Sequence, residues 1–168
     1  MSSPVQTIKN LELDEDATSQ YLTFLLAGEE YGLDILKVQE IRGWEQPTML
    51  PNALNYVLGV INLRGTVVPI IDLRQRFALE KSQFGQTTVV VIVKVSSADK
   101  ERTVGIVVDA VSEVYNVNDE QIRPTPDLGG AISMEFVKGL ATLGEKMIIL
   151  LDIDKLINTG VLKEIATH

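Results

Sequence analysis

Two stretches of this chain repeat each other, and this constrains the fold more than any other feature of the sequence. With a shift of 80 residues, the stretch 59–73 lies over 139–153, and both begin with glycine and carry aspartate at the same place, Asp72 and Asp152. A second match, with a shift of 73, places 31–41 over 104–114. Two matches in the same order at similar shifts predict two copies of one unit. Chance similarity between β-rich stretches is the alternative.

The stretch 59–73 itself predicts a β-hairpin. Gly65 is free to adopt a positive φ and is therefore expected in the turn. The valines and isoleucines after it suit a pleated and mostly buried strand, and they are Val67, Val68, Ile70 and Ile71. Pro69 cannot donate a ladder hydrogen bond, which predicts an edge strand or a bulge.

Arg64 is the one charged residue in the apolar run that precedes Asp72. It is either a solvated turn residue or a functional charge at the mouth of a barrel. A position that supports the fold should recur in both copies, but the counterpart of Arg64 is Gly144. This favours a functional role for Arg64. Glu40 does recur, as Glu113, which favours a structural role for Glu40.

The rest of the chain predicts about ten short strands and few helices. Strands are expected at 21–26, 31–35, 88–95 and 103–108, whereas 36–41 fits a strand or one helical turn. Short helices are expected from Asn52 to Val57 and over 73–79, the latter capped by Asp72. This pattern predicts an all-β fold with two small β-barrels, short helices and a C-terminal helix over about 152–162.

The domain boundaries follow from the same pattern. We expect a disordered acidic tail at 1–19, with a first-turn helix or a partner-binding arm as the alternative. The first subdomain is expected at about 20–85 and the second at about 86–157.

Composition excludes several classes of function. The chain of 168 residues has no cysteine, and its one histidine is His168, so thiol chemistry and interior histidine catalysis are excluded. The net charge of −8 opposes nucleic-acid binding. No apolar run reaches the roughly 20 residues that span a bilayer, and no secretion signal is recognised. We therefore predict a cytoplasmic protein without membrane insertion.

Catalytic motifs are not found either. The chain has no phosphate-binding glycine loop, no nucleophile elbow and no metal-binding cluster, which predicts a protein that is no enzyme and needs no cofactor. Asp72 and Asp152 are expected to cap helices rather than to catalyse. Glu40, Arg42 and Arg64 each lie beside apolar residues, as on a protein-binding surface. Trp44 is expected in a core or as a cap rather than as a ligand platform.

Five motifs in order resemble the CheW chemotaxis coupling proteins, from about Tyr21 to Ile157. They are YGLDI at 31–35, VQEIRG at 38–43, GVINLRG at 59–65, VPIIDL at 68–73 and VGIVVD at 104–109. The resemblance implies two SH3-like five-stranded β-barrels and a non-catalytic adaptor. It also implies two partners, the regulatory domain of a CheA-type histidine kinase and the hairpin tip of methyl-accepting chemoreceptors, in polar arrays at the membrane.

The resemblance also implies site residues. Those expected in a receptor-binding groove are Val38, Glu40, Arg64, Gly105, Val107 and Val108. Those expected near the kinase are Ile41, Arg42 and Gly43. We expect Val38 and Val108 to serve as apolar anchors for a receptor helix, and Glu40 to pair with Arg64. Another protein- or nucleic-acid-binding double-barrel module is the alternative.

Overall fold

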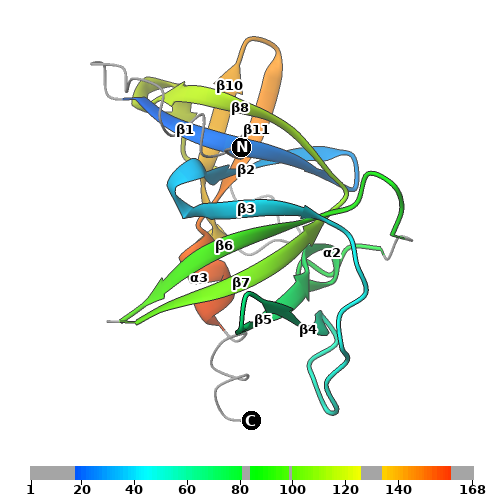
Figure 1. The fold of residues 1–168 in the computed structure, drawn as a ribbon. Helices are drawn as coiled ribbons and strands as arrows, with labels where there is room; N and C mark the ends of the chain where they lie inside the picture. Colours follow the sequence, from blue (N-terminus) through cyan, green and yellow to red (C-terminus); the bar gives the residue numbers. More distant parts are fainter. Residues whose placement is uncertain (1–17, 81–83, 99, 126–133, 160–168) are drawn as a thin grey trace.

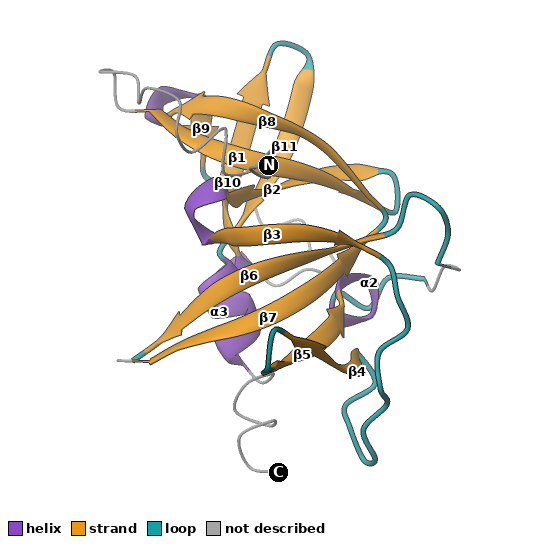
Figure 2. Ribbon diagram, viewed as in Figure 1, coloured by secondary structure: helices purple, strands orange, loops and turns teal. Residues whose placement is uncertain are grey.

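The described part of the chain forms two antiparallel-rich sheets packed on each other (Figures 1 and 2). The structure is a computed structural model that describes residues 18–80, 84–98, 100–125 and 134–159. Sheet A contains, in spatial order, β8 (Ala110–Asn118), β1 (Thr18–Leu26), β2 (Glu29–Asp34), β11 (Lys146–Leu151), β10 (Val137–Leu143) and β9 (Ile122–Arg123). Sheet B contains β3 (Val38–Gly43), β6 (Val89–Ser97), β7 (Lys100–Val108), β5 (Thr66–Asp72) and β4 (Val57–Leu63).

Helices are short and connect the strands. Among the described residues, the 3₁₀ helices are η1 (Ile35–Lys37), η2 (Asp119–Gln121) and η3 (Met134–Phe136), and the α-helices are α2 (Leu73–Arg76) and α3 (Ile153–Ile157). The predicted all-β class with few short helices is therefore confirmed, and the two sheets are consistent with the two predicted barrels. None of the helices in the described ranges is both long and apolar enough to cross a membrane.

The two sheets have the same strand order once the copies are matched. The hairpin β1–β2 occupies in sheet A the place that β6–β7 occupies in sheet B, and β8, β10 and β11 correspond to β3, β4 and β5. Each sheet therefore combines the hairpin of one copy with three matched strands of the other, and sheet A has the short β9 as an additional edge strand. This arrangement is called the exchanged arrangement below.

Ladder details support the duplication. The parallel pair Gly32–Leu150 in sheet A corresponds to Gly105–Ile70 in sheet B under the shifts of 73 and 80. The β4–β5 ladder is irregular just before Gly59, and the β10–β11 ladder is irregular just before its counterpart, Gly139. Features of this kind recur when two units share one backbone design.

The exchange corrects the expected division of the chain. A boundary near residue 86 separates the two copies in sequence, but it does not separate the two sheets. Sheet B takes β3 to β7 from both sides of that boundary, and sheet A takes the hairpin that precedes them and the strands that follow. The sheets do not follow the division of the sequence because the first hairpin of each copy pairs with strands of the other copy.

The described residues form three buried apolar clusters. The largest contains Phe24 and Tyr31 of sheet A, Val93 of sheet B and Phe77, which follows α2, and it holds the sheets together. A second cluster belongs to sheet B, with Ile70 and Ile92 among its buried residues. A third belongs to sheet A, with Tyr21, Ile148 and Leu150. Each sheet thus curls around its own core and also contributes to a shared one.

Both predicted helix caps are confirmed. The carboxylate of Asp72 accepts from the Arg74 backbone N–H at 3.1 Å, and that of Asp152 accepts from the Lys155 N–H at 3.1 Å. Helix α2 ends at Arg76 instead of reaching residue 79, and Ala78 has a φ of 58°. The stretch 36–41 is partly helical and partly strand, since η1 leads directly into β3.

Other expectations at the level of single elements were wrong. Asn52 does not begin a helix; it has a φ of 57° and lies in a turn. Thr18 and Ser19 belong to β1 and not to a tail. Residues 1–17 and the predicted helix end at 160–162 lie outside the described residues. Strand β5 is not an edge strand, but its pairing with β7 begins at Ile70, one residue after Pro69.

Candidate protein-binding site

Strand β3 places two charged side chains on the face of sheet B that encloses its core. A ladder irregularity lies between Val38 and Glu40, after which Glu40 is opposite Ile92 and Arg42 is opposite Val90. Those two partners belong to the sheet B cluster. Ile41, between the charged residues, packs against the shared core instead. Because side chains alternate along a strand, Glu40 and Arg42 both lie on the face of sheet B that carries its own apolar cluster.

The turn between β4 and β5 brings Arg64 to this strand. Arg64 and Gly65 have φ values of 50° and 88°, as the central residues of a type I′ turn require. The Asn62 side chain fastens the turn by accepting from the Gly65 N–H at 2.8 Å. The predicted pairing is present: Arg64 Nη2 donates to Glu40 Oε1, so that the hairpin tip is tied to β3.

A small charge network surrounds Glu40. The hydrogen bond from Arg64 lowers the pKa of the Glu40 carboxyl, and Arg42, 3.4 Å away, acts in the same direction. Arg42 also reaches Glu45 at 3.6 Å. The side chain of Arg64 is 66% exposed, whereas that of Glu40 is 21% exposed. Arg64 is thus held by a carboxylate on one side and remains available to a partner on the other.

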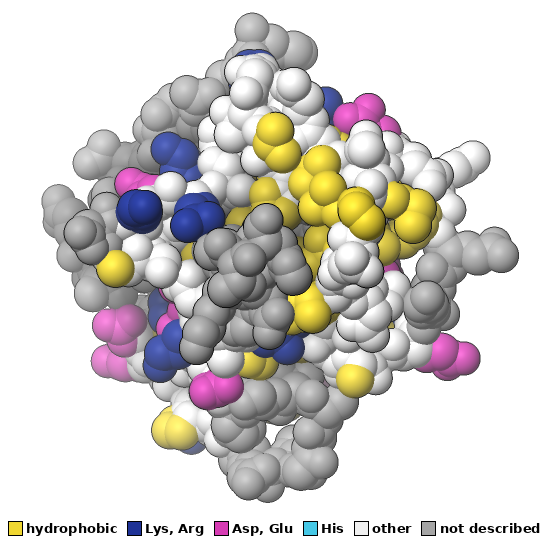
Figure 3. Space-filling view, turned by 90° about the horizontal axis from the view of Figure 1, so that it is seen from below, with side chains coloured by type: hydrophobic (Ala, Val, Ile, Leu, Met, Phe, Trp, Pro, Cys, Tyr) yellow, Lys and Arg dark blue, Asp and Glu magenta, His cyan; other side chains and the backbone are white. Residues whose placement is uncertain are grey.

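An apolar groove adjoins the same hairpin. Its volume is about 490 Å³, and its lining includes Leu50, Val60, Val67, Pro69 and Arg102. Val67 is 64% exposed. On the lower side of the molecule in Figure 1, where β4 and β5 lie, Figure 3 shows hydrophobic side chains gathered over a wide area. An exposed arginine beside an exposed apolar surface is typical of protein-binding sites.

The aliphatic residues expected in the receptor groove are buried. Val38, Val107 and Val108 are 0%, 3% and 1% exposed, and all three belong to the apolar clusters. Gly105 is also interior, since a Cβ there would lie 2.6 Å from Ile70 Cδ1. An anchor role for Val38 and Val108 does not fit this burial, because neither side chain has surface left to offer. Their place in the core of a two-layer fold decided this.

The residues expected near the kinase form one continuous segment beside Glu40. Ile41 and Arg42 are half-buried, and Gly43 is exposed at the end of β3. Trp44 follows and packs against the sheet B core, and its ring stacks on Phe84 with centroids 4.1 Å apart. The expected core or cap role of Trp44 is therefore confirmed.

Sequence reasoning missed the apolar part of the surface. Val67 was expected in a mostly buried strand, but it alternates with buried Val68 and faces outward. The period-2 pattern of strand burial was a usable signal. Leu50 carried no such signal, since it lies in an irregular loop.

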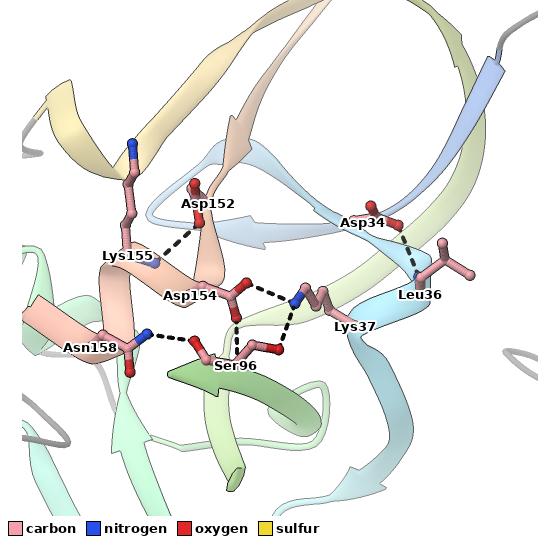
Figure 4. Close-up of polar contacts among 8 residues, drawn as sticks. All are labelled: Asp34, Leu36, Lys37, Ser96, Asp152, Asp154, Lys155 and Asn158. Carbon is pink, nitrogen blue, oxygen red and sulfur yellow. Dashed lines mark hydrogen bonds and ion pairs between the residues drawn. The ribbon is translucent and has the colours of Figure 1, made fainter. Parts of the chain in front are cut away.

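A second group of charged residues lies where α3 meets η1 and β6 (Figure 4). Asp154 pairs with Lys37 at 2.7 Å, and its other oxygen accepts from the Ser96 N–H at 2.8 Å. Asp34 accepts from the Leu36 N–H at 3.0 Å and caps η1. Asp152 caps α3, as described above. These carboxylates serve the fold, and the described residues contain no cluster of three or more metal-ligating side chains.

Comparison with known proteins identifies the class of protein. The profile of the CheW-like domain matches residues 20–160. The crystal structure of the scaffolding protein TtCheW from Thermoanaerobacter tengcongensis superimposes with a TM-score of 0.77 at 33% sequence identity, over 86% of this chain and 95% of that one. This double-sheet fold is thus that of a chemotaxis scaffold.

Sequence relatives agree with that class. The chain is 47% identical over 145 residues to the chemotaxis protein CheW of Klebsiella aerogenes, covering 86% of this chain and 85% of the relative. It is 33% identical over 153 residues to CheW of Treponema pallidum, covering 90% and 89%. The chain therefore belongs to the CheW family, as its motifs predicted.

Proposed function

We propose that this chain is a non-catalytic adaptor that couples methyl-accepting chemoreceptors to a CheA-type histidine kinase. Family membership supports a scaffolding role. The β4–β5 hairpin supplies an exposed arginine, Arg64, and exposed apolar side chains such as Val67, which suit contact with a protein partner. The observation that carries the proposal is that one hairpin, β4–β5, holds both the exposed Arg64, paired with Glu40 at its tip, and an exposed apolar groove along its outer face. We assign the adaptor role to residues 20–160, in the cytoplasm and at receptor arrays.

The receptor-binding surface is proposed to consist of exposed residues. Arg64 and Val67 lie at the tip and on the outer face of the β4–β5 hairpin, and Leu50 lines the same groove. Glu40 orients Arg64 by accepting its hydrogen bond. The buried valines beneath hold the strands that present this surface. The kinase contact is proposed at Ile41, Arg42 and Gly43, where β3 ends in exposed backbone.

Calorimetric titration tests this proposal. The purified chain is titrated with the regulatory domain of a CheA-type kinase and, separately, with a soluble receptor hairpin fragment. Arg64→Glu and Val67→Asp are expected to weaken receptor binding at least tenfold, because they place a negative charge in the proposed contact. Met147→Asp is the matched control: Met147 is 57% exposed at the corresponding place of the β10–β11 hairpin.

The outcomes separate the two contacts. Loss of receptor binding with kinase binding retained assigns the groove to the receptor. If Arg64→Glu and Val67→Asp bind both partners as the wild type does, the groove is not the site. If the folded wild type binds neither, the alternative of a double-barrel module with another partner gains support. Retention of DNA by the chain at low salt would favour a nucleic acid, against the charge of −8.

A further inference from the structure

Two ion pairs fasten the exchanged hairpins, and each is the counterpart of the other. Each involves the second residue of the helix that follows the last strand of a copy, namely Arg74 in α2 and Asp154 in α3. Each reaches the junction where the hairpin of the other copy leaves its sheet. Arg74 pairs with Asp109, between β7 and β8, and Asp154 pairs with Lys37, between β2 and β3.

The Arg74–Asp109 pair has bidentate geometry. Arg74 Nε donates to Asp109 Oδ1 at 2.8 Å, and Nη2 donates to Oδ2 at 2.6 Å. Oδ2 also accepts from the Ala27 N–H at 2.9 Å, in the turn between β1 and β2. The two side chains are 18% and 29% exposed. Such geometry makes this a directional contact and not a loose surface pair.

The Lys37–Asp154 pair forms the same connection in the other sheet, with the charges reversed (Figure 4). Lys37 comes from η1 and Asp154 from α3, at a distance of 2.7 Å. Asp154 also binds the Ser96 N–H at the end of β6, and the Asn158 amide donates to the Ser96 carbonyl at 2.8 Å.

Strand pairing explains why both contacts fall at these places. Strand β5 runs parallel to β7, so the helix after β5 starts beside the end of β7. Strand β11 runs parallel to β2, so the helix after β11 starts beside the end of β2. The residue on each helix (Arg74 or Asp154) therefore meets a different junction residue (Asp109 or Lys37) depending on which hairpin has paired with the preceding strand.

The charge pattern would be unfavourable in the other possible arrangement. If each hairpin closed on its own copy, β2 would lie beside β5 and β7 beside β11. Arg74 would then face Lys37, and Asp154 would face Asp109. Both contacts would bring like charges together. Packing alone discriminates weakly, because both parallel contacts set a glycine against a branched aliphatic residue, Leu150 or Ile70.

We infer that the opposite polarity of the Arg74–Asp109 and Lys37–Asp154 pairs selects the exchanged pairing of hairpins over one in which each repeat closes on itself. Like-charge contacts in a wrong pairing are an established way in which proteins specify one partner against another. Here the competing partners are the two hairpins of one chain.

Three full-length variants test this inference. The one-pair inversion, R74D/D109R, makes the charges complementary in both arrangements. The two-pair inversion adds K37D/D154K and makes them complementary in the exchanged arrangement alone. The helix exchange, R74D/D154R, makes them complementary in the self-closed arrangement alone. The first two variants share the local losses around Arg74, so they form a matched comparison.

Each variant is refolded from urea and cross-linked with a zero-length carbodiimide. The reporter is the Lys146–Glu30 cross-link, whose native contact of 3.7 Å joins β11 to β2 and requires the exchanged arrangement. Trp44 fluorescence follows the refolding rate. We expect the two-pair inversion to refold with a single population and the cross-link yield of the wild type. We expect the one-pair inversion to gain a slow phase and to lose cross-link yield.

The helix exchange is expected to lower the urea midpoint and to lose most of the cross-link. If it does not fold, the comparison of the two inversions still decides. The inference is overturned if the one-pair inversion refolds and cross-links as the two-pair inversion does. It is also overturned if the helix exchange retains the midpoint and cross-link yield of the wild type.

Discussion

Lys146 donates a 2.9 Å hydrogen bond to the hydroxyl of Tyr115, and this contact in sheet A takes the place of the Glu40–Arg64 pair in sheet B. Tyr115 lies on β8, the counterpart of β3, and Lys146 begins β11, just beyond the hairpin turn. In both sheets a cation near the tip of one hairpin (β10–β11 or β4–β5) contacts the edge strand at the other end of the sheet (β8 or β3). The residue types differ, but the same two elements are connected.

This relationship changes the argument for Arg64. The mismatch of Arg64 with Gly144 suggested a function restricted to one copy. Because Lys146 supplies a comparable cation two residues further on, a missing counterpart no longer distinguishes Arg64. What distinguishes Arg64 is that the outer face of its own hairpin lines an exposed apolar groove.

A double-mutant cycle tests the Glu40–Arg64 pair. Glu40→Gln, Arg64→Gln and the double variant are expected to show a coupling of about 0.2–1 kcal/mol in unfolding free energy, because the arginine is largely exposed and screened by solvent. Urea unfolding followed by Trp44 fluorescence measures it. The coupling should shrink in 1 M salt, where the Debye length is about 3 Å; a coupling that salt leaves unchanged would contradict an exposed ion pair.

Glycines at the parallel contacts are expected to be sensitive to size. An alanine Cβ at Gly105 would lie 2.6 Å from Ile70 Cδ1 and 2.9 Å from Val90 Cγ1. Gly105→Ala should therefore cost about 1–3 kcal/mol through overpacking. Gly32→Ala should cost less, since its nearest contact would be 3.0 Å. Gly43→Ala is the control, because no atom lies within 4 Å, and chemical denaturation of all three gives the ranking.

The two helix caps should differ in strength. Asp72 is 5% exposed and also accepts from the Gln75 side-chain amide at 3.2 Å, whereas Asp152 is half-buried. Loss of a cap costs about 0.5–2 kcal/mol. We expect Asp72→Ala to fall near the top of that range and Asp152→Ala near the bottom, measured by thermal unfolding. An equal loss would mean that burial of Asp72 adds nothing to its capping.

Acid should weaken the Arg74–Asp109 connection. Burial opposes ionisation of Asp109, but hydrogen bonds from Arg74 and the Ala27 N–H outweigh it and lower the pKa of this carboxyl below its usual 3.8. A carboxyl with a lowered native pKa stabilises the fold above its unfolded-state pKa and loses that contribution as pH falls through the native pKa.

The comparison of wild type with Asp109→Asn measures this contribution. The difference in unfolding free energy should be constant above about pH 5, where the carboxyl is ionised in both states. It should shrink below pH 3.8, the ordinary value for aspartate. Guanidinium unfolding at several pH values follows the change, and a difference that grows on acidification would have the wrong sign.

Neighbouring residues were enough to predict the main turn, both helix caps and most of the strands, and short motifs were enough to predict the family. The turn at Arg64-Gly65, the caps at Asp72 and Asp152 and the alternation of β-branched residues are written in neighbouring letters, because turns, caps and strands depend on residues a few positions apart. The pattern of short strands predicted the all-β class, and the five motifs predicted the CheW family in the same way.

The way in which the two copies combine, and the exposure of each side chain, depended on contacts between segments far apart in the chain. The hairpins β1–β2 and β6–β7 are similar in sequence, and so are the two sets of strands with which they could pair. The sequences of these strands therefore do not specify which hairpin joins which set. Charges at Arg74, Asp109, Lys37 and Asp154 are far apart in the chain and meet only in the folded state. Likewise, burial of Val38 and exposure of Val67 depend on which face of each strand the second layer covers.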